Sequence, residues 1–152
     1  TLRSILGLGF VYIAGTSLFR IYPQAVRGLD KKKTDGTPDL NDEEINVALK
    51  IDRLIILDKL YQEPSYSRKD MAVELGVSEA IVSKVINAYF GKSFPQLLNE
   101  HRVQDAKRLL DQTDAPVKIV GEEVGFNSLA TFNRVFKEIS GLSPSEYRKG
   151  AH

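Results

Sequence analysis

The sequence predicts an all-α protein in which a long connecting helix joins two helix-turn-helix units. Two stretches about fifty residues apart each place a glycine between two short amphipathic patterns, and an unbroken helical pattern lies between them. One such stretch is weak evidence, because a glycine between two helices most often reflects plain packing. Two copies in one small domain are far more specific. The chain has 152 residues and 42% apolar content, enough for one domain core with length left for a linker or tail.

The composition excludes several kinds of site. The chain has no cysteine, so it can form neither a disulfide nor a cysteine-based zinc site. We expect no metal, no cofactor and no enzymatic activity. The formal net charge is +1, but residues 20–33 carry a net charge of +4 and residues 34–63 a net charge of −5. Residues 64–152 have a net charge of +1, so any nucleic-acid affinity must come from bases gathered on one face and must depend strongly on salt.

Residues 1–22 form an apolar segment, and residues 23–40 form a basic and polar linker. The segment contains sixteen uncharged residues between Arg3 and Arg20, slightly fewer than a spanning helix needs. We favour the last transmembrane helix of a truncated membrane sensor, because basic residues follow it on the side expected to face the cytoplasm. Two alternatives stay open: a helix buried against a missing sensor domain, and a signal peptide, which a missing cleavage site disfavours.

A leading helix is predicted over residues 41–63, within a domain that runs from residue 41 to residue 152. Asn41 is a good N-cap, and Glu44 stands where a capping box needs it. The apolar positions are wider than one stripe requires: Ile45, Ala48, Leu49, Ile51, Leu54, Ile55, Leu57 and Leu60. One side can pack on the first unit, and residues 45–60 could also pair with a second protomer. The alternative is that all of these residues belong to the core.

The first helix-turn-helix unit is predicted over residues 67–91. Ser67 caps a helix that ends near Gly76, and Ser78 caps the helix that follows. The apolar residues at helical spacing are Met71, Ala72, Leu75, Ile81, Val82, Val85 and Ile86. Gly91 ends the second helix as a left-handed cap would.

The connecting helix is predicted over residues 93–112, with Ser93 as its cap and Pro95 in its first turn. A lone histidine on a helix, here His101, does not make a catalytic set without a nearby carboxylate and nucleophile. Arg102 is expected to brace the domain or to contact a phosphate. A rigid helix of this length could hold two recognition helices about 34 Å apart, which is one turn of DNA.

The second unit is predicted over residues 116–140. Val117, Val120 and Val124 mark its first helix, and Gly125 forms the turn. Ser128 can cap a second helix whose apolar stripe runs through Leu129, Phe132, Val135, Phe136 and Ile139. A final short helix is expected because Ser143 and Glu146 can form a capping box with Pro144 at the first helical position. Tyr147 is expected in the core.

Several motifs of the chain belong together: Val124-Gly125-Phe126, Phe132, Arg134-Val135-Phe136-Lys137, residues 141–148, and Arg102, Ala106, Leu109 and Leu110 of the connecting helix. At these motifs the chain resembles the AraC/XylS family of bacterial transcription regulators. The resemblance covers roughly residues 45–149. Gly121 departs from the family, which usually has alanine there, and Ile119 occupies a position that is commonly polar. A glycine inside a helix costs roughly 1 kcal/mol relative to alanine, so we expect a less stable first helix in this unit.

The resemblance implies a sequence-specific regulator of transcription, such as an activator, that binds double-stranded DNA in two successive major grooves. By position, the base-facing residues of the first unit are Ala80, Ser83, Lys84 and Asn87. Those of the second unit are Leu129, Ala130, Thr131, Asn133 and Arg134. Lys84 and Arg134 suit guanine or phosphate, and Asn133 suits adenine. Arg148 and Lys149 are expected to reach the DNA backbone.

The resemblance also bears on partners and location. A subgroup of the family carries membrane-embedded sensors, which fits a cytoplasmic DNA-binding domain tethered to the inner membrane through residues 4–22. RNA polymerase and a second protomer are further candidate partners. The alternative function is a membrane-proximal helical module that binds a protein through residues 45–60 and does not bind DNA.

Overall fold

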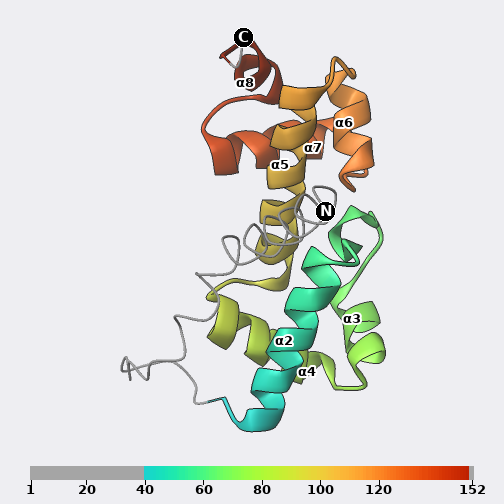
Figure 1. Ribbon diagram of the computed structural model, residues 1–152, viewed down its shortest axis with the longest axis vertical. Coiled ribbons are helices and arrows are strands. Elements are labelled where there is room, and N and C mark those ends of the chain that lie inside the picture. The colour runs from blue at the N-terminus through green and yellow to red at the C-terminus, as the bar shows by residue number, and fades with distance from the viewer. Residues whose placement is uncertain (1–39, 151–152) are drawn as a thin grey trace, which may run out of the picture. The chain divides into compact units, whose positions relative to one another are not determined.

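The computed structural model of the chain describes residues 40–150 (Figure 1). Seven α-helices follow one another in these residues, which contain no strand. The all-α prediction is therefore confirmed for this part of the chain. The predicted apolar helix of residues 1–22 and the linker, apart from Leu40, lie outside the described residues. Within residues 40–150, no helix is both long enough and apolar enough to cross a membrane.

The leading helix α2 spans Asp42–Ile56. The predicted capping box is present: the Asn41 side chain accepts from the Glu44 N–H at 2.9 Å, and Glu44 accepts from the Asn41 N–H at 3.1 Å. The predicted extent to residue 63 is wrong. Lys59 adopts a left-handed conformation with φ 51°, which an α-helix cannot contain. Glycine or asparagine usually marks such a stop, and a lysine gives no sequence signal of it.

The strap, as we name residues 59–64, connects α2 to the first helix-turn-helix unit. It contains a short 3₁₀ helix, η2, at Leu60–Gln62. Tyr61 is buried at 6% exposure, so the strap is anchored in the core through this ring. The Tyr61 carbonyl and the Gln62 side-chain amide both bind side chains of α5.

The first unit consists of α3 (Arg68–Leu75) and α4 (Glu79–Val85), joined through Gly76 with φ 67°. The predicted caps form, since Ser67 accepts from the Asp70 N–H and Ser78 accepts from the Ile81 N–H. The sequence analysis did not predict the π-helical form of the last turn of this unit. After Val85 the helix widens into a π-helical segment, η3, at Ile86–Phe90, and Gly91 then ends it with φ 67°. Such widening changes the direction of the side chains that follow, including Asn87.

The connecting helix α5 spans Phe94–Gln112, close to its predicted bounds. Its 19 residues give a length of about 28 Å. Ser93 and Gln96 form a capping box, and Pro95 lies in the first turn, where its missing N–H has no cost. Figure 1 shows α5 running from the first unit to the second, and it contacts η2 and η3 as well as α6, α7 and α8.

The second unit consists of α6 (Val117–Glu123) and α7 (Leu129–Ser140), followed by α8 (Pro144–Gly150). Gly125 forms the turn with φ 98°. The lower stability expected of α6 because of Gly121 stays a prediction, and the structure adds a packing reason for this glycine. A Cβ at Gly121 would lie 2.7 Å from Cδ1 and 2.9 Å from Cγ of the buried Phe132 ring. Glycine is therefore what allows α6 and α7 to approach this closely.

The buried apolar side chains form two clusters. The first cluster lies among α2, the strap, the first unit and the start of α5: Val47, Ala48, Ile51, Ile55, Tyr61, Met71, Ala72, Val82, Val85, Ile86, Leu97 and Leu98. The second lies among the rest of α5 and the second unit: Val103, Ala106, Leu110, Val120, Val124, Phe126, Phe132, Val135 and Phe136. Tyr147 packs against the second cluster, as predicted. Leu129 and Ile139 were predicted on the apolar stripe of α7 but are 42% and 38% exposed.

Candidate nucleic-acid interface

Four predicted site residues lie on α4 and η3. Ala80, Lys84 and Asn87 are exposed, and Ser83 is half-buried. The opposite side of the same helix is fully packed, because Val82, Val85 and Ile86 have no exposed surface. The first unit therefore presents a small, polar and partly basic face, as the helical period requires.

Lys84 is already paired within the protein. Its Nζ lies 2.6 Å from Oε1 of Glu44, which also holds the capping box of α2. The Lys84 side chain is 42% exposed and that of Glu44 only 12%. The hydrogen bond from Lys84, together with the one from the Asn41 N–H, lowers the pKa of Glu44. Another anion would therefore compete for Lys84 with a carboxylate whose position is fixed by a helix cap.

Arg68 is a candidate that the sequence analysis missed. It stands at the first position of α3, where Nε donates to Oε2 of Glu79 at 3.0 Å and Nη1 donates to Oγ of Ser83 at 3.1 Å. Arg68 thus adds a guanidinium beside the predicted residue Ser83. The available signal was electrostatic, since a cation is unfavourable in the first turn of a helix and needs another reason to be there.

Five predicted site residues lie on the first half of α7. All of them are exposed: Leu129, Ala130, Thr131, Asn133 and Arg134. Ser128 caps the helix by accepting from the Thr131 N–H at 3.2 Å. Nη1 of Arg134 lies 3.3 Å from Oε2 of Glu138, and these two side chains are 69% and 70% exposed. An exposed pair one turn apart contributes little, so Arg134 can change partners at low cost.

Arg148, which was expected to reach the DNA backbone, is bound within the protein instead. Its Nη2 donates to the carbonyl of Ala115 at 2.7 Å and to that of Thr113 at 3.4 Å, which ties α8 to the segment between α5 and α6. Its role in this structure is to hold that segment. Lys149 is exposed.

His101 lies on α5 with its ring stacked on Tyr61, at 5.7 Å between centroids. Burial lowers the pKa of His101, and Lys92 lowers it further, against smaller opposing effects of Asp52 and Glu100. The ring is thus a packing residue between α5 and the strap. Residues 40–150 hold no group of three or more histidine, cysteine or acidic side chains that could bind a metal.

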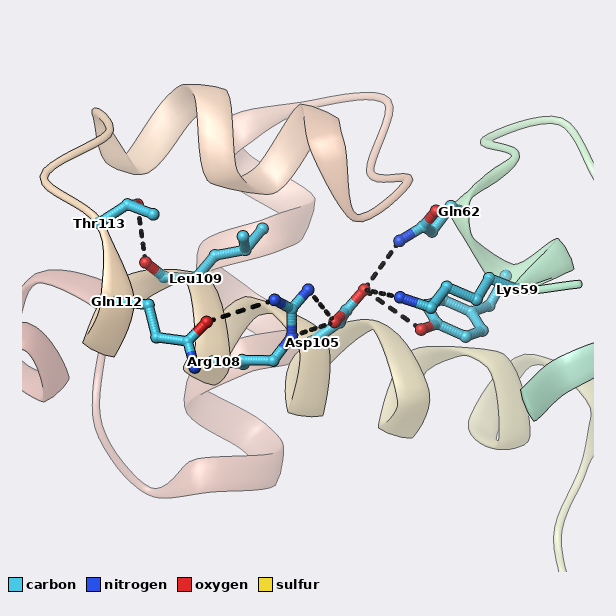
Figure 2. Close-up of polar contacts among 8 residues, drawn as sticks. Lys59, Gln62, Asp105, Arg108, Leu109, Gln112 and Thr113 are labelled. Atoms are coloured by element: carbon cyan, nitrogen blue, oxygen red, sulfur yellow. Dashed lines mark hydrogen bonds and ion pairs between the residues drawn. The ribbon is translucent and has the colours of Figure 1, made fainter. Parts of the chain in front are cut away.

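Asp105 links α5 to the strap (Figure 2). Figure 2 shows its carboxylate between Arg108 on one side and Gln62 and Lys59 on the other. Nε2 of Gln62 donates to Oδ2 at 2.8 Å, and Arg108 donates to Oδ1 through Nε at 2.9 Å and through Nη2 at 2.7 Å. Burial by itself would raise the pKa of Asp105, but these hydrogen bonds and the nearby Lys59 hold it below its usual range. The side chain is 7% exposed, so it stays charged only because its partners surround it.

Comparison with known proteins points to one family. The family model of a helix-turn-helix domain matches residues 71–150, more than half of the chain. The chain is 34% identical over 93 residues to the HTH-type transcriptional regulator YisR of Bacillus subtilis, and 33% identical over 88 residues to the arabinose operon regulatory protein of Escherichia coli. These matches cover 61% and 58% of this chain but only 32% and 30% of the relatives, so the chain spans about a third of their length.

Solved structures agree with this assignment. The C-terminal domain of AraT, a response regulator from Geobacillus stearothermophilus, superposes with a TM-score of 0.62 at 27% identity. The match covers 74% of this chain and 88% of that domain. The paired helix-turn-helix units, the connecting helix and the matched family model lead to one conclusion: the chain belongs to the family of AraC-type helix-turn-helix DNA-binding domains.

Proposed function

We propose that residues 40–150 form a sequence-specific DNA-binding domain that regulates transcription, with α4 and α7 as its two recognition helices. The observation that carries the proposal is the exposure of the predicted faces. On each helix the apolar side is buried in its own cluster, while the small, polar and basic residues of the other side face outward. A helix with such a face fits the major groove, where side chains can contact base edges.

Three cations give these faces their positive charge: Lys84, Arg68 and Arg134. Each lies within 3.3 Å of a carboxylate of this chain, namely Glu44, Glu79 and Glu138. Binding to DNA would replace these carboxylates with phosphate or guanine, so affinity should arise only where a good replacement is present. This exchange favours discrimination between sequences over strong general binding.

Simultaneous contact with two successive major grooves also belongs to the proposal. It is supported by the length of α5, about 28 Å, which suits two elements separated by roughly one turn of duplex. Tethering to the inner membrane through residues 4–22, contact with RNA polymerase, and pairing of two protomers through residues 45–60 stay predictions. Leu49, Ile56 and Leu57 on that last surface are 54%, 50% and 63% exposed.

The test is selection of bound sites from random duplex at physiological salt, followed by affinity measurements on variants. Arg134→Ala should weaken binding to the selected duplex by about 1–3 kcal/mol and reduce the preference for it over unrelated duplex. Lys118→Ala is the matched control, since Lys118 on α6 also pairs with an acid one turn away, at 3.7 Å from Glu122. It should leave the preference between duplexes unchanged.

Either of two outcomes would overturn the proposal. If folded protein enriches no duplex, or if Arg134→Ala and Lys84→Ala both leave the preference unchanged, then α4 and α7 do not contact bases. The exposed apolar residues of α2 would in that case become the better candidate for function, through binding to a protein.

A further inference from the structure

The strap is held from two directions at once. From α5, Nε of Arg102 donates to the carbonyl of Tyr61 at 2.6 Å, and Nη2 of Arg102 donates to that of Glu63 at 3.2 Å. Asp105, one turn further along α5, accepts from the Tyr61 hydroxyl at 3.2 Å and from the Gln62 amide at 2.8 Å. Two charged side chains of one helix therefore bind three consecutive residues of the strap.

The turn of the second unit holds the strap from its other direction. A Cβ added at Gly125 would lie 2.6 Å from the Tyr61 carbonyl oxygen and 2.7 Å from that of Gln62, so the backbone of the turn passes close to the strap. Nδ2 of Asn127 donates to the Pro64 carbonyl at 3.3 Å. Phe126, which lies between Gly125 and Asn127 in the sequence, has its ring centroid 5.6 Å from Cζ of Arg102. The strap belongs to the first unit through Tyr61, yet it directly contacts the turn of the second.

The two apolar clusters do not by themselves fix the orientation of one unit relative to the other. Each cluster packs on its own half of α5, and long helices are rarely straight, so the bending of α5 also affects the orientation. The contacts of the strap join the units directly and resist such bending. They are polar and directional, and Asp105 is buried while Arg102 is half-buried, so a small displacement leaves several donors and acceptors without partners.

We propose that Arg102 and Asp105 are positioning residues, which lock the strap between the two units and so set the orientation of one recognition helix relative to the other. The proposal makes the strap part of the DNA-binding machinery even though it need not touch DNA. The consequence for DNA recognition rests on the function proposed above. The consequence for orientation does not, and it can be measured without any DNA.

The first experiment measures the distance between two spin labels on the two units. The chain has no native cysteine, so Val73→Cys on α3 and Lys118→Cys on α6 can be labelled selectively; these side chains are 75% and 67% exposed. We expect a narrow distance distribution for the otherwise unchanged chain and a clearly broadened one with Asp105→Asn or Arg102→Gln. Gln104→Ala is the control, because Gln104 is an exposed side chain of the same helix and should leave the width unchanged.

A further variant guards against loss of the fold. Asn127→Ala removes the hydrogen bond from the second unit to the strap, involves an exposed side chain and leaves α5 intact. It should broaden the distribution to a smaller degree. Folded Asp105→Asn, Arg102→Gln and Asn127→Ala variants that all keep the narrow distribution would overturn the proposal. If the first two unfold, the result with Asn127→Ala decides.

The second experiment uses duplexes selected by the unchanged chain, with one to four base pairs added between the two contacted segments. Each added base pair turns one segment relative to the other, so the unchanged chain should lose about tenfold in affinity for a small insertion. The Asp105→Asn variant should lose less than about threefold, because its units can reorient. Equal losses would count against the proposal. Failure to select any duplex, together with broadened label distances, would refute the proposed function and leave the role of the strap supported.

Discussion

The two helix-turn-helix units share a plan but differ in how their outward faces are partnered. In the first unit, Lys84 is bound to Glu44 of another helix, whose side chain is 12% exposed and fixed by a helix cap. In the second unit, Arg134 is near Glu138 of its own helix, and both side chains are about two-thirds exposed. On the proposed function, Lys84 would give up an ordered contact when the first unit binds DNA, whereas Arg134 would give up only a weaker, exposed one.

The turns of the two units differ in how closely the rest of the domain packs against them, and here the second unit is the more restrained. Gly125 of the second unit packs closely against the strap, because a Cβ added there would lie 2.6 Å and 2.7 Å from two backbone oxygens of the strap. At Gly76 of the first unit, an added Cβ would find no atom of the described residues within 4 Å. The unit with the more open polar face is thus the one whose turn is most tightly enclosed by the rest of the domain.

The largest effect should come from Gly125→Ala compared with Gly76→Ala. Both glycines have a positive φ, which costs an alanine about 1–2 kcal/mol. Gly125→Ala adds a collision with backbone that cannot move aside easily, so the loss in free energy of unfolding should be on the order of 3 kcal/mol or more. Denaturation by urea, followed by circular dichroism, measures both. Equal losses for the two variants would mean that the strap is not in firm contact with the second turn.

An intermediate effect is expected from Glu44→Gln. Glutamine keeps the capping box but removes the charge that holds Lys84, so affinity for unrelated duplex should rise at low salt. Glu43→Gln removes the same charge one residue away on α2 and should raise the affinity less. Filter binding over a range of salt concentrations separates the two. If the variants behave alike, only the net charge matters, and Lys84 is not restrained by its partner.

The smallest effect concerns pH and the first unit. Because the pKa of His101 is lowered by burial, the unfolded chain takes up this proton at a higher pH than the folded chain. The contribution of neutral His101 to the free energy of unfolding is therefore fully present above the ordinary histidine pKa near 6.5, and it declines as the pH falls below that value. His101→Gln should flatten this decline. Hydrogen exchange should show the effect first in the strap, where Tyr61 stacks on His101. A decline unchanged by the substitution would refute the prediction.

The local elements were predictable because their signals are local. The serine caps at positions 67, 78, 93 and 128 and the glycine turns follow from residues within one helical turn of each other, and the structure contains them. The buried sides of α4 and α7 follow from periodicity in the same way, apart from Leu129 and Ile139 at the edges of the stripe. The positions of the candidate site residues on exposed faces could therefore be anticipated.

What could not be predicted depends on contacts between distant parts of the chain. Lys84 meets Glu44 across 40 residues, and Gln62 meets Asp105 across 43. No period or spacing in the sequence encodes such pairs. The end of α2 at Ile56 is similar, because Lys59 adopts its left-handed conformation without glycine. The partners of Arg148 were missed for the same reason, since its carbonyl acceptors lie 33 and 35 residues away.

The close approach of Gly121 to the Phe132 ring limits which substitutions this domain can accept during evolution. Alanine at position 121 would ordinarily favour the helix, yet here its methyl group would enter space that the ring already fills. Alanine becomes acceptable only if the ring or the two helices shift. The resemblance implies alanine at this position together with an aromatic ring on the next helix, and that combination would require α6 and α7 to lie slightly further apart than they do in this chain.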